Sequence, residues 1–160
     1  MTPASFRDAR KVPASNAASL YLGLGQNQPV GPVARTSLVR SAGGPVDEAG
    51  MTYAEMVSES GLPRIAAYAD AIGVEASLVV GADGRPTGLV AAAKAAGLSV
   101  HAWTLRKENA FLPPALRKGS AEAATGDFAA AWSLLEAAGV EGVFTDDPAL
   151  AVPLRRSALP

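Results

Sequence analysis

The strongest constraint on the fold is a repeated pattern, from Met51 onward, of amphipathic helical segments that end at glycine and lead into short apolar runs. Glycine often follows the last helical residue, and a short apolar run is typical of a buried strand. Thr52 and Glu55 also have the spacing of a helix capping box. The pattern predicts helices over 52–58, 63–73, 89–96 and 127–138, strands over 76–80, 98–104 and 140–145, and a short closing helix after Asp147-Pro148.

This order of elements indicates the fold class. Helices that alternate with short apolar strands are typical of βα units around a parallel sheet, because two parallel strands need a crossover connection. The sequence therefore predicts an α/β protein with parallel strands and crossover helices. In such folds ligands bind at the carboxyl ends of the strands, where the loops form a crevice.

Residues 1–50 have a different character from the rest of the chain. Five prolines lie in this segment, and proline blocks the interior of a helix because it lacks a backbone donor. Residues 20–24, Leu-Tyr-Leu-Gly-Leu, are the best candidate for a buried strand. We expect loop over the remaining residues of this segment, and likewise a long polar loop over 106–125.

The composition excludes several classes of function. The chain has no cysteine, which removes disulfides and thiolate chemistry, and one histidine, which rules out any two-histidine mechanism within it. With 14 basic and 15 acidic residues its formal charge is −1. We therefore expect no nucleic-acid partner, because such proteins carry a basic surface.

Neither a membrane span nor an export signal is readable in the chain. No run approaches the ~18 consecutive apolar residues that a transmembrane helix requires. The charged start is not followed by the apolar core of a signal peptide. This predicts a cytoplasmic protein by default, although a start upstream would leave the compartment open.

Two predicted strand ends carry side chains suited to a small ligand. One end contains Trp103, Thr104 and Arg106, and the other contains Asp146. An aromatic ring, a hydroxyl, a guanidinium and a carboxylate can together hold a polyol or phosphate, and arginine binds phosphate through a bidentate fork. We expect these four residues to line a substrate pocket.

The same residues also have structural interpretations. Trp103 can fill the core, and Arg106 can belong to a solvated loop. Asp146-Asp147 before Pro148 can form a helix cap and turn. His101 lies inside a predicted strand, where a structural role is more common than a catalytic one.

Short motifs follow one another in order between about Met51 and Val152. They are TYAE at 52–55, GL at 61–62, YADAIG at 68–73, AAGLSVHAWTLR at 95–106, EN at 108–109, FLP at 111–113 and AGVEGVFTDDP at 138–148. This series resembles the C-terminal part of the glycerophosphodiester phosphodiesterase family, whose fold is a TIM barrel. Trp103 matches an aromatic position near the mouth of that family's pocket, where it would form a wall for the glycerol carbons. Asp146 matches the late Thr-Asp-x-Pro turn.

The resemblance implies a specific chemistry. Members of the family hydrolyse glycerophosphodiesters to an alcohol and glycerol 3-phosphate, with a divalent cation such as Ca²⁺ or Mg²⁺ held by carboxylates and two histidines for acid–base work. Those groups belong to an early His-Arg-Gly motif, a Glu-x-Asp pair, a second histidine and a later glutamate. All lie on the first half of the barrel, which this sequence does not match. His101 corresponds to a late position outside the catalytic set.

The sequence therefore predicts a partial TIM barrel made of the late βα units. A full barrel typically needs ~250 residues and rarely has fewer than ~200, whereas this chain has 160. We expect residues 51–160 to form those units after a weakly matching segment 1–50. We expect no catalytic residue, no metal ligand and no activity in the chain alone; its glycerophosphodiester partner and its metal belong to the full-length family.

Two other interpretations stay open. The chain can be a non-enzymatic binding module that self-associates through open sheet edges, or completes a barrel with a partner that carries the first half. It can also be a truncated gene model whose true start lies upstream.

Overall fold

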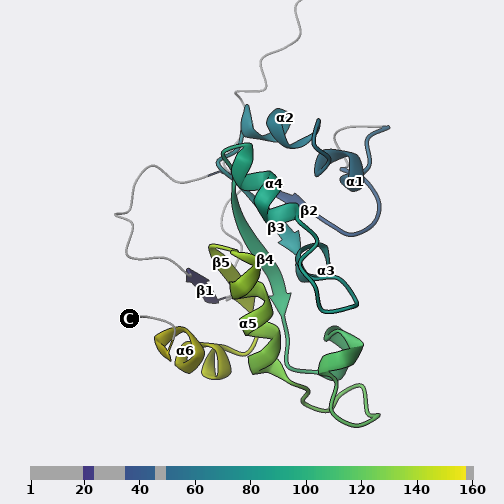
Figure 1. Ribbon diagram of the computed structural model, residues 1–160, viewed down its shortest axis with the longest axis vertical. Helices are drawn as coiled ribbons and strands as arrows, with labels where there is room; N and C mark the ends of the chain where they lie inside the picture. Colours follow the sequence, from purple (N-terminus) through teal and green to yellow (C-terminus); the bar gives the residue numbers. More distant parts are fainter. Residues whose placement is uncertain (1–19, 24–34, 46–49, 158–160) are drawn as a thin grey trace, which may run out of the picture.

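The chain forms one five-stranded sheet with helices packed along it (Figure 1). The computed structural model describes residues 20–23, 35–45 and 50–157. Its strands are β1 (Leu20–Gly23), β2 (Thr36–Val39), β3 (Ala71–Glu75), β4 (Ser99–Leu105) and β5 (Gly142–Thr145). Its helices are α1 (Tyr53–Met56), α2 (Leu62–Ala66), α3 (Ala76–Val79), α4 (Leu89–Ala95), α5 (Phe128–Ala138) and α6 (Pro148–Ser157), with 3₁₀ turns η2 (Asn109–Phe111) and η3 (Pro114–Leu116).

The sheet order is β1-β5-β4-β3-β2, and β2 to β5 pair in parallel in the order in which they occur in the sequence. Consecutive parallel neighbours joined by helices are the arrangement of part of a TIM barrel. The predicted α/β class with parallel strands and crossover helices is confirmed. The strand predicted at 20–24 is present as β1, but it pairs antiparallel with β5, so it does not run in the direction of a barrel strand.

The two faces of the sheet differ in burial. Ile72, Val74, Val100 and Ala102 are fully buried on the face that packs against helices, where α4 and α5 lie over β4 (Figure 1). The intervening residues point to the opposite face, which corresponds to the inside of a barrel. There Leu38 on β2 is 64% exposed. The hydrophobic core therefore lies on the helix side of the sheet.

The capping residues predicted for several helix ends are confirmed. Thr52 and Glu55 form the complete capping box at the start of α1, although that helix ends at Met56 rather than Ser58. Asp127 accepts the backbone N–H of Ala130 at the start of α5. Gly139 ends α5 with a φ of +88°, a conformation that glycine adopts without steric cost.

The prediction for residues 63–80 was wrong both in its boundaries and in the type of element. The predicted helix over 63–73 ends at Ala66, and residues 71–75 form β3 instead. The predicted strand over 76–80 is the short helix α3. Ile72 fits both a helical face and an alternating strand. Residues 71–75 adopt the strand conformation because they pair with β2 on one side and β4 on the other. Periodicity cannot separate a short buried strand from a buried helical turn.

The N-terminal segment also differs from the prediction, because residues 36–39 form β2 where loop was expected. Its alternating exposed and buried residues are too few to stand out, and pairing with β3 supplies the order. The expected loop over 106–125 is largely irregular but contains η2 and η3. Within the described residues no helix has the length and apolar character needed to span a bilayer.

Candidate functional site

The carboxyl ends of β4 and β5 lie side by side and bring the two predicted strand-end motifs together. Leu105 pairs with Thr145 after a register shift that follows Ala102. The Thr145 hydroxyl donates to the Leu105 carbonyl at 2.7 Å and accepts the backbone N–H of Asp147 at 3.1 Å. Thr145 is 1% exposed, so this hydroxyl is a buried tie between the two strand ends.

Arg106 and Asp146 form an ion pair at this edge. Arg106 Nη2 lies 2.7 Å from Asp146 Oδ2, and both side chains are partly exposed. The Arg106 guanidinium also lies 4.7 Å from the centroid of the Phe111 ring, a cation–π contact. The guanidinium that was expected to bind phosphate is therefore already paired with a carboxylate.

Lys107 and Asp147 make a second, parallel contact one residue further along. The Asp147 carboxylate accepts the backbone N–H of Lys107 at 3.1 Å, and its other oxygen accepts the Lys107 ammonium. This hydrogen bond, aided by the negative charge, raises the pKa of Lys107. The Asp147 side chain is only 10% exposed. The two strand-end loops are thus held together by two adjacent charged pairs.

Trp103 and Thr104 lie apart from the charged pairs and on opposite faces of the sheet. Trp103 pairs in register with Glu75 on the inner face, and a Cβ atom built at Gly73 would lie 3.7 Å from Trp103 Cδ1. The indole Nε1 is buried, and the described part of the chain offers it no hydrogen-bond partner. Thr104 instead lines a pocket beside α3 and α5. Of the four predicted site residues, Arg106 and Asp146 form an ion pair, whereas Trp103 and Thr104 lie on the two faces of β4.

His101 lies on the inner face of β4, opposite Gly142 and Gly73 of the two neighbouring strands. The side chain is half-buried. Burial lowers the pKa of His101, and the nearby Glu141 charge opposes that shift. The imidazole is therefore neutral near pH 7.

Asn109 is a functional candidate that the sequence analysis did not single out. It is 2% exposed, and its amide nitrogen donates to the carbonyls of Lys118 and Ala121 at 2.9 and 2.8 Å. Its oxygen accepts the Lys118 N–H at 2.9 Å. Asn109 thus orders the segment 107–126, and this segment places the Phe111 ring against the Arg106 guanidinium. The signal available in the sequence was its place in the EN motif at 108–109; asparagine by itself is common in loops of every kind.

The donor set for the divalent cation implied by the family resemblance does not fit the described residues. No group of three or more His, Cys, Asp or Glu side chains gathers within those ranges. The two carboxylates at the strand ends, Asp146 and Asp147, are each paired with a cation of the chain itself. We derive no catalytic step through a metal from these residues.

The parallel βα units and their joined strand ends define an α/β protein of the TIM-barrel class. The family model for the glycerophosphoryl diester phosphodiesterase family matches residues 6–150, and the chain belongs to that family. The match extends well before Thr52, the first residue of the motif series. Comparison with curated proteins yields no match.

Proposed function

We propose that the chain serves the glycerophosphodiester chemistry of its family as a supporting part and does not hydrolyse the substrate by itself. The observation that carries this proposal is the single histidine of the 160 residues. By resemblance, hydrolysis requires two histidines, one of them in a His-Arg-Gly motif that is missing here. His101 lies within β4, and its side chain is neutral and half-buried.

The strand ends of β4 and β5 are the part of the chain proposed to face a glycerophosphodiester. Arg106 supplies a guanidinium there, but its partner Asp146 competes for it at 2.7 Å. A phosphodiester must displace that carboxylate to gain a bidentate contact with the guanidinium. Trp103 lies on the inner face of β4, where it would form an apolar wall for the substrate, whereas Thr104 lies on the helix side. The divalent cation, Ca²⁺ or Mg²⁺, would be held by carboxylates outside the matched motifs.

A coupled assay tests the proposal. The purified chain is incubated with glycerophosphocholine and either Ca²⁺ or Mg²⁺, and released glycerol 3-phosphate is measured with its dehydrogenase. We expect no release above a mock preparation from the same host without the gene. Release that a chelator abolishes, and that the mock preparation lacks, would overturn the proposal.

A second proposed function is self-association through the exposed sheet. Within the described residues β2 ends the sheet, since its other neighbour is β3, whereas β1 covers the outer edge of β5. On that open strand the Leu38 side chain is 64% exposed on the inner face, and it lies over Gly73. An apolar side chain on an edge strand favours pairing with another copy of the chain.

Light scattering after size-exclusion chromatography tests self-association over a range of concentrations. Leu38→Asp should convert a dimer to a monomer by placing a charge on the edge strand. Leu150→Asp is the matched control, because Leu150 is an exposed leucine on α6, away from β2. A monomeric wild type at all concentrations, or equal effects of both variants, would contradict a role for the β2 edge.

A further inference from the structure

A pocket of about 240 Å³ lies on the helix side of the sheet, beside the carboxyl end of β4. It is bounded by α3 and the loop that follows it, by α5, and by the segment 110–117. Thr104 and Leu105, at the end of β4 where its pairing with β5 is irregular, both line the pocket. The pocket is separate from the inner face that would hold the family's substrate.

The lining of the pocket is apolar with one charge. Its deep wall includes the buried side chains of Leu105, Leu112 and Leu135. Among the described residues that line it, Arg117 is the one with an ionised side chain, and no carboxylate of the lining opposes it. An apolar wall with a single cation favours a ligand that has an apolar body and one negative charge.

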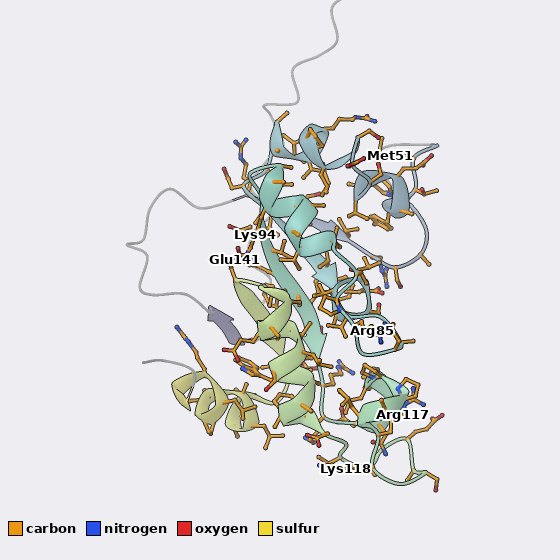
Figure 2. The ribbon with its side chains drawn as sticks, in the orientation of Figure 1. Met51, Arg85, Lys94, Arg117, Lys118 and Glu141 are labelled. Atoms are coloured by element: carbon orange, nitrogen blue, oxygen red, sulfur yellow. The ribbon has the colours of Figure 1, made fainter. Side chains whose placement is uncertain are left out.

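The guanidinium of Arg117 is held in a defined orientation. Its Nε atom donates to the Leu112 carbonyl at 3.0 Å, which anchors the side chain at the pocket, and within the described ranges its terminal nitrogens have no hydrogen-bond partner. Two terminal nitrogens match the two oxygens of a carboxylate. Two other arginines lie outside the lining: Arg106, which stacks on the Phe111 ring, and Arg85, which lies on the same side of the molecule as Arg117 in Figure 2.

We propose that this pocket binds a medium-chain carboxylate, with its alkyl chain against Leu105, Leu112 and Leu135 and its carboxylate on Arg117. An apolar cavity of about 150 Å³ accommodates benzene, so 240 Å³ has room for a chain of about eight carbons. The single guanidinium of the lining balances the one negative charge of a carboxylate, whereas a phosphate monoester carries about 1.5 to 2 negative charges. The inference does not depend on phosphodiesterase activity.

Titration of the full chain with octanoate tests the proposal, with leucine methyl NMR as the readout. The methyl signals of Leu112 and Leu135 should shift with saturation, while those of the exposed Leu38 and Leu150 stay in place. Octan-1-ol, which has the same chain without the charge, should bind about tenfold more weakly, as loss of a charge-assisted hydrogen bond predicts.

Two arginine variants separate the pocket from general charge effects. Arg117→Gln should weaken octanoate binding about tenfold and leave octan-1-ol binding unchanged. Arg85→Gln, on an exposed arginine outside the lining, should bind octanoate like the wild type. Absence of shifts at the pocket methyl groups, equal affinity for octanoate and octan-1-ol, or equal losses in both variants would each overturn the proposal.

Discussion

The Asp147 carboxylate accepts hydrogen bonds from both the backbone N–H and the ammonium group of Lys107, so one side chain joins the loops that follow β4 and β5. This contact spans 40 residues of sequence, and the adjacent pair of Arg106 and Asp146 spans the same separation. The Thr-Asp-Asp-Pro motif at 145–148 therefore links the carboxyl ends of β4 and β5 through its side chains.

Asp147→Ala should destabilise the fold by about 1–3 kcal/mol, because it leaves a partly buried N–H and an ammonium without their acceptor. The free energy of unfolding in urea measures the effect. Glu59→Ala is the control, since Glu59 is an exposed carboxylate outside this contact. Equal stability of the Asp147 variant and the wild type would show that the contact contributes nothing.

Thr145→Val should cost about 1–3 kcal/mol, since valine keeps the shape but removes the hydroxyl that bonds to Leu105 and Asp147. Thr145→Ser keeps that hydroxyl and should retain more of the stability. Thermal and urea unfolding of the two variants compare them directly. A serine variant less stable than the valine variant would assign the role to the methyl group instead.

Asn109→Ala should destabilise the chain by about 1–3 kcal/mol, because it removes a buried side chain that donates to the carbonyls of Lys118 and Ala121. Hydrogen exchange should become faster at the Lys118 N–H, which now bonds to the Asn109 oxygen. Ser120→Ala, at an exposed position of the same segment, should leave exchange unchanged. If both variants behaved like the wild type, Asn109 would not organise this segment.

His101 should titrate below its ordinary pKa of 6.5, because burial disfavours the charged imidazole. The unfolded chain then binds the proton more tightly than the folded chain. The stability contributed by neutral His101 is full above pH 6.5 and is lost as the pH falls toward the lower folded pKa.

The single histidine makes this prediction easy to check, since one imidazole C2–H signal appears in the NMR spectrum. Glu141→Gln should lower the midpoint further by removing the charge that opposes the shift. His101→Gln should flatten the dependence of unfolding free energy on pH over that window. A titration midpoint above 6.5 would contradict the assignment of burial as the cause.

The predictable part of the fold was the part whose signals are local. Gly139 after α5, the cap at Asp127 and the strand that contains His101 follow from turn chemistry and periodicity along the chain. The misplaced elements depend on distant partners instead. Strand β3 is a strand because β2 and β4 hydrogen-bond to its two edges, and neither neighbour is visible from its own five residues.

The candidate site shows the same division. The pairing of two strand ends was predictable from the parallel order, and Arg106 and Asp146 do meet there. The opposite faces taken by Trp103 and Thr104 follow from the alternation of side chains along a strand. The position of Leu105 was not predictable, because the pairing of β4 with β5 shifts register between Ala102 and Leu105.

The segment between β4 and α5 begins and ends at almost one place, since the Gly126 N–H donates to the Lys107 carbonyl at 2.8 Å. Within the segment, the Asn109 side chain forms hydrogen bonds with the backbone of Lys118. A loop whose two ends lie this close together can change in length and surface between relatives while β4 and α5 keep their positions. Specificity can therefore evolve in this segment without rebuilding the sheet that carries it.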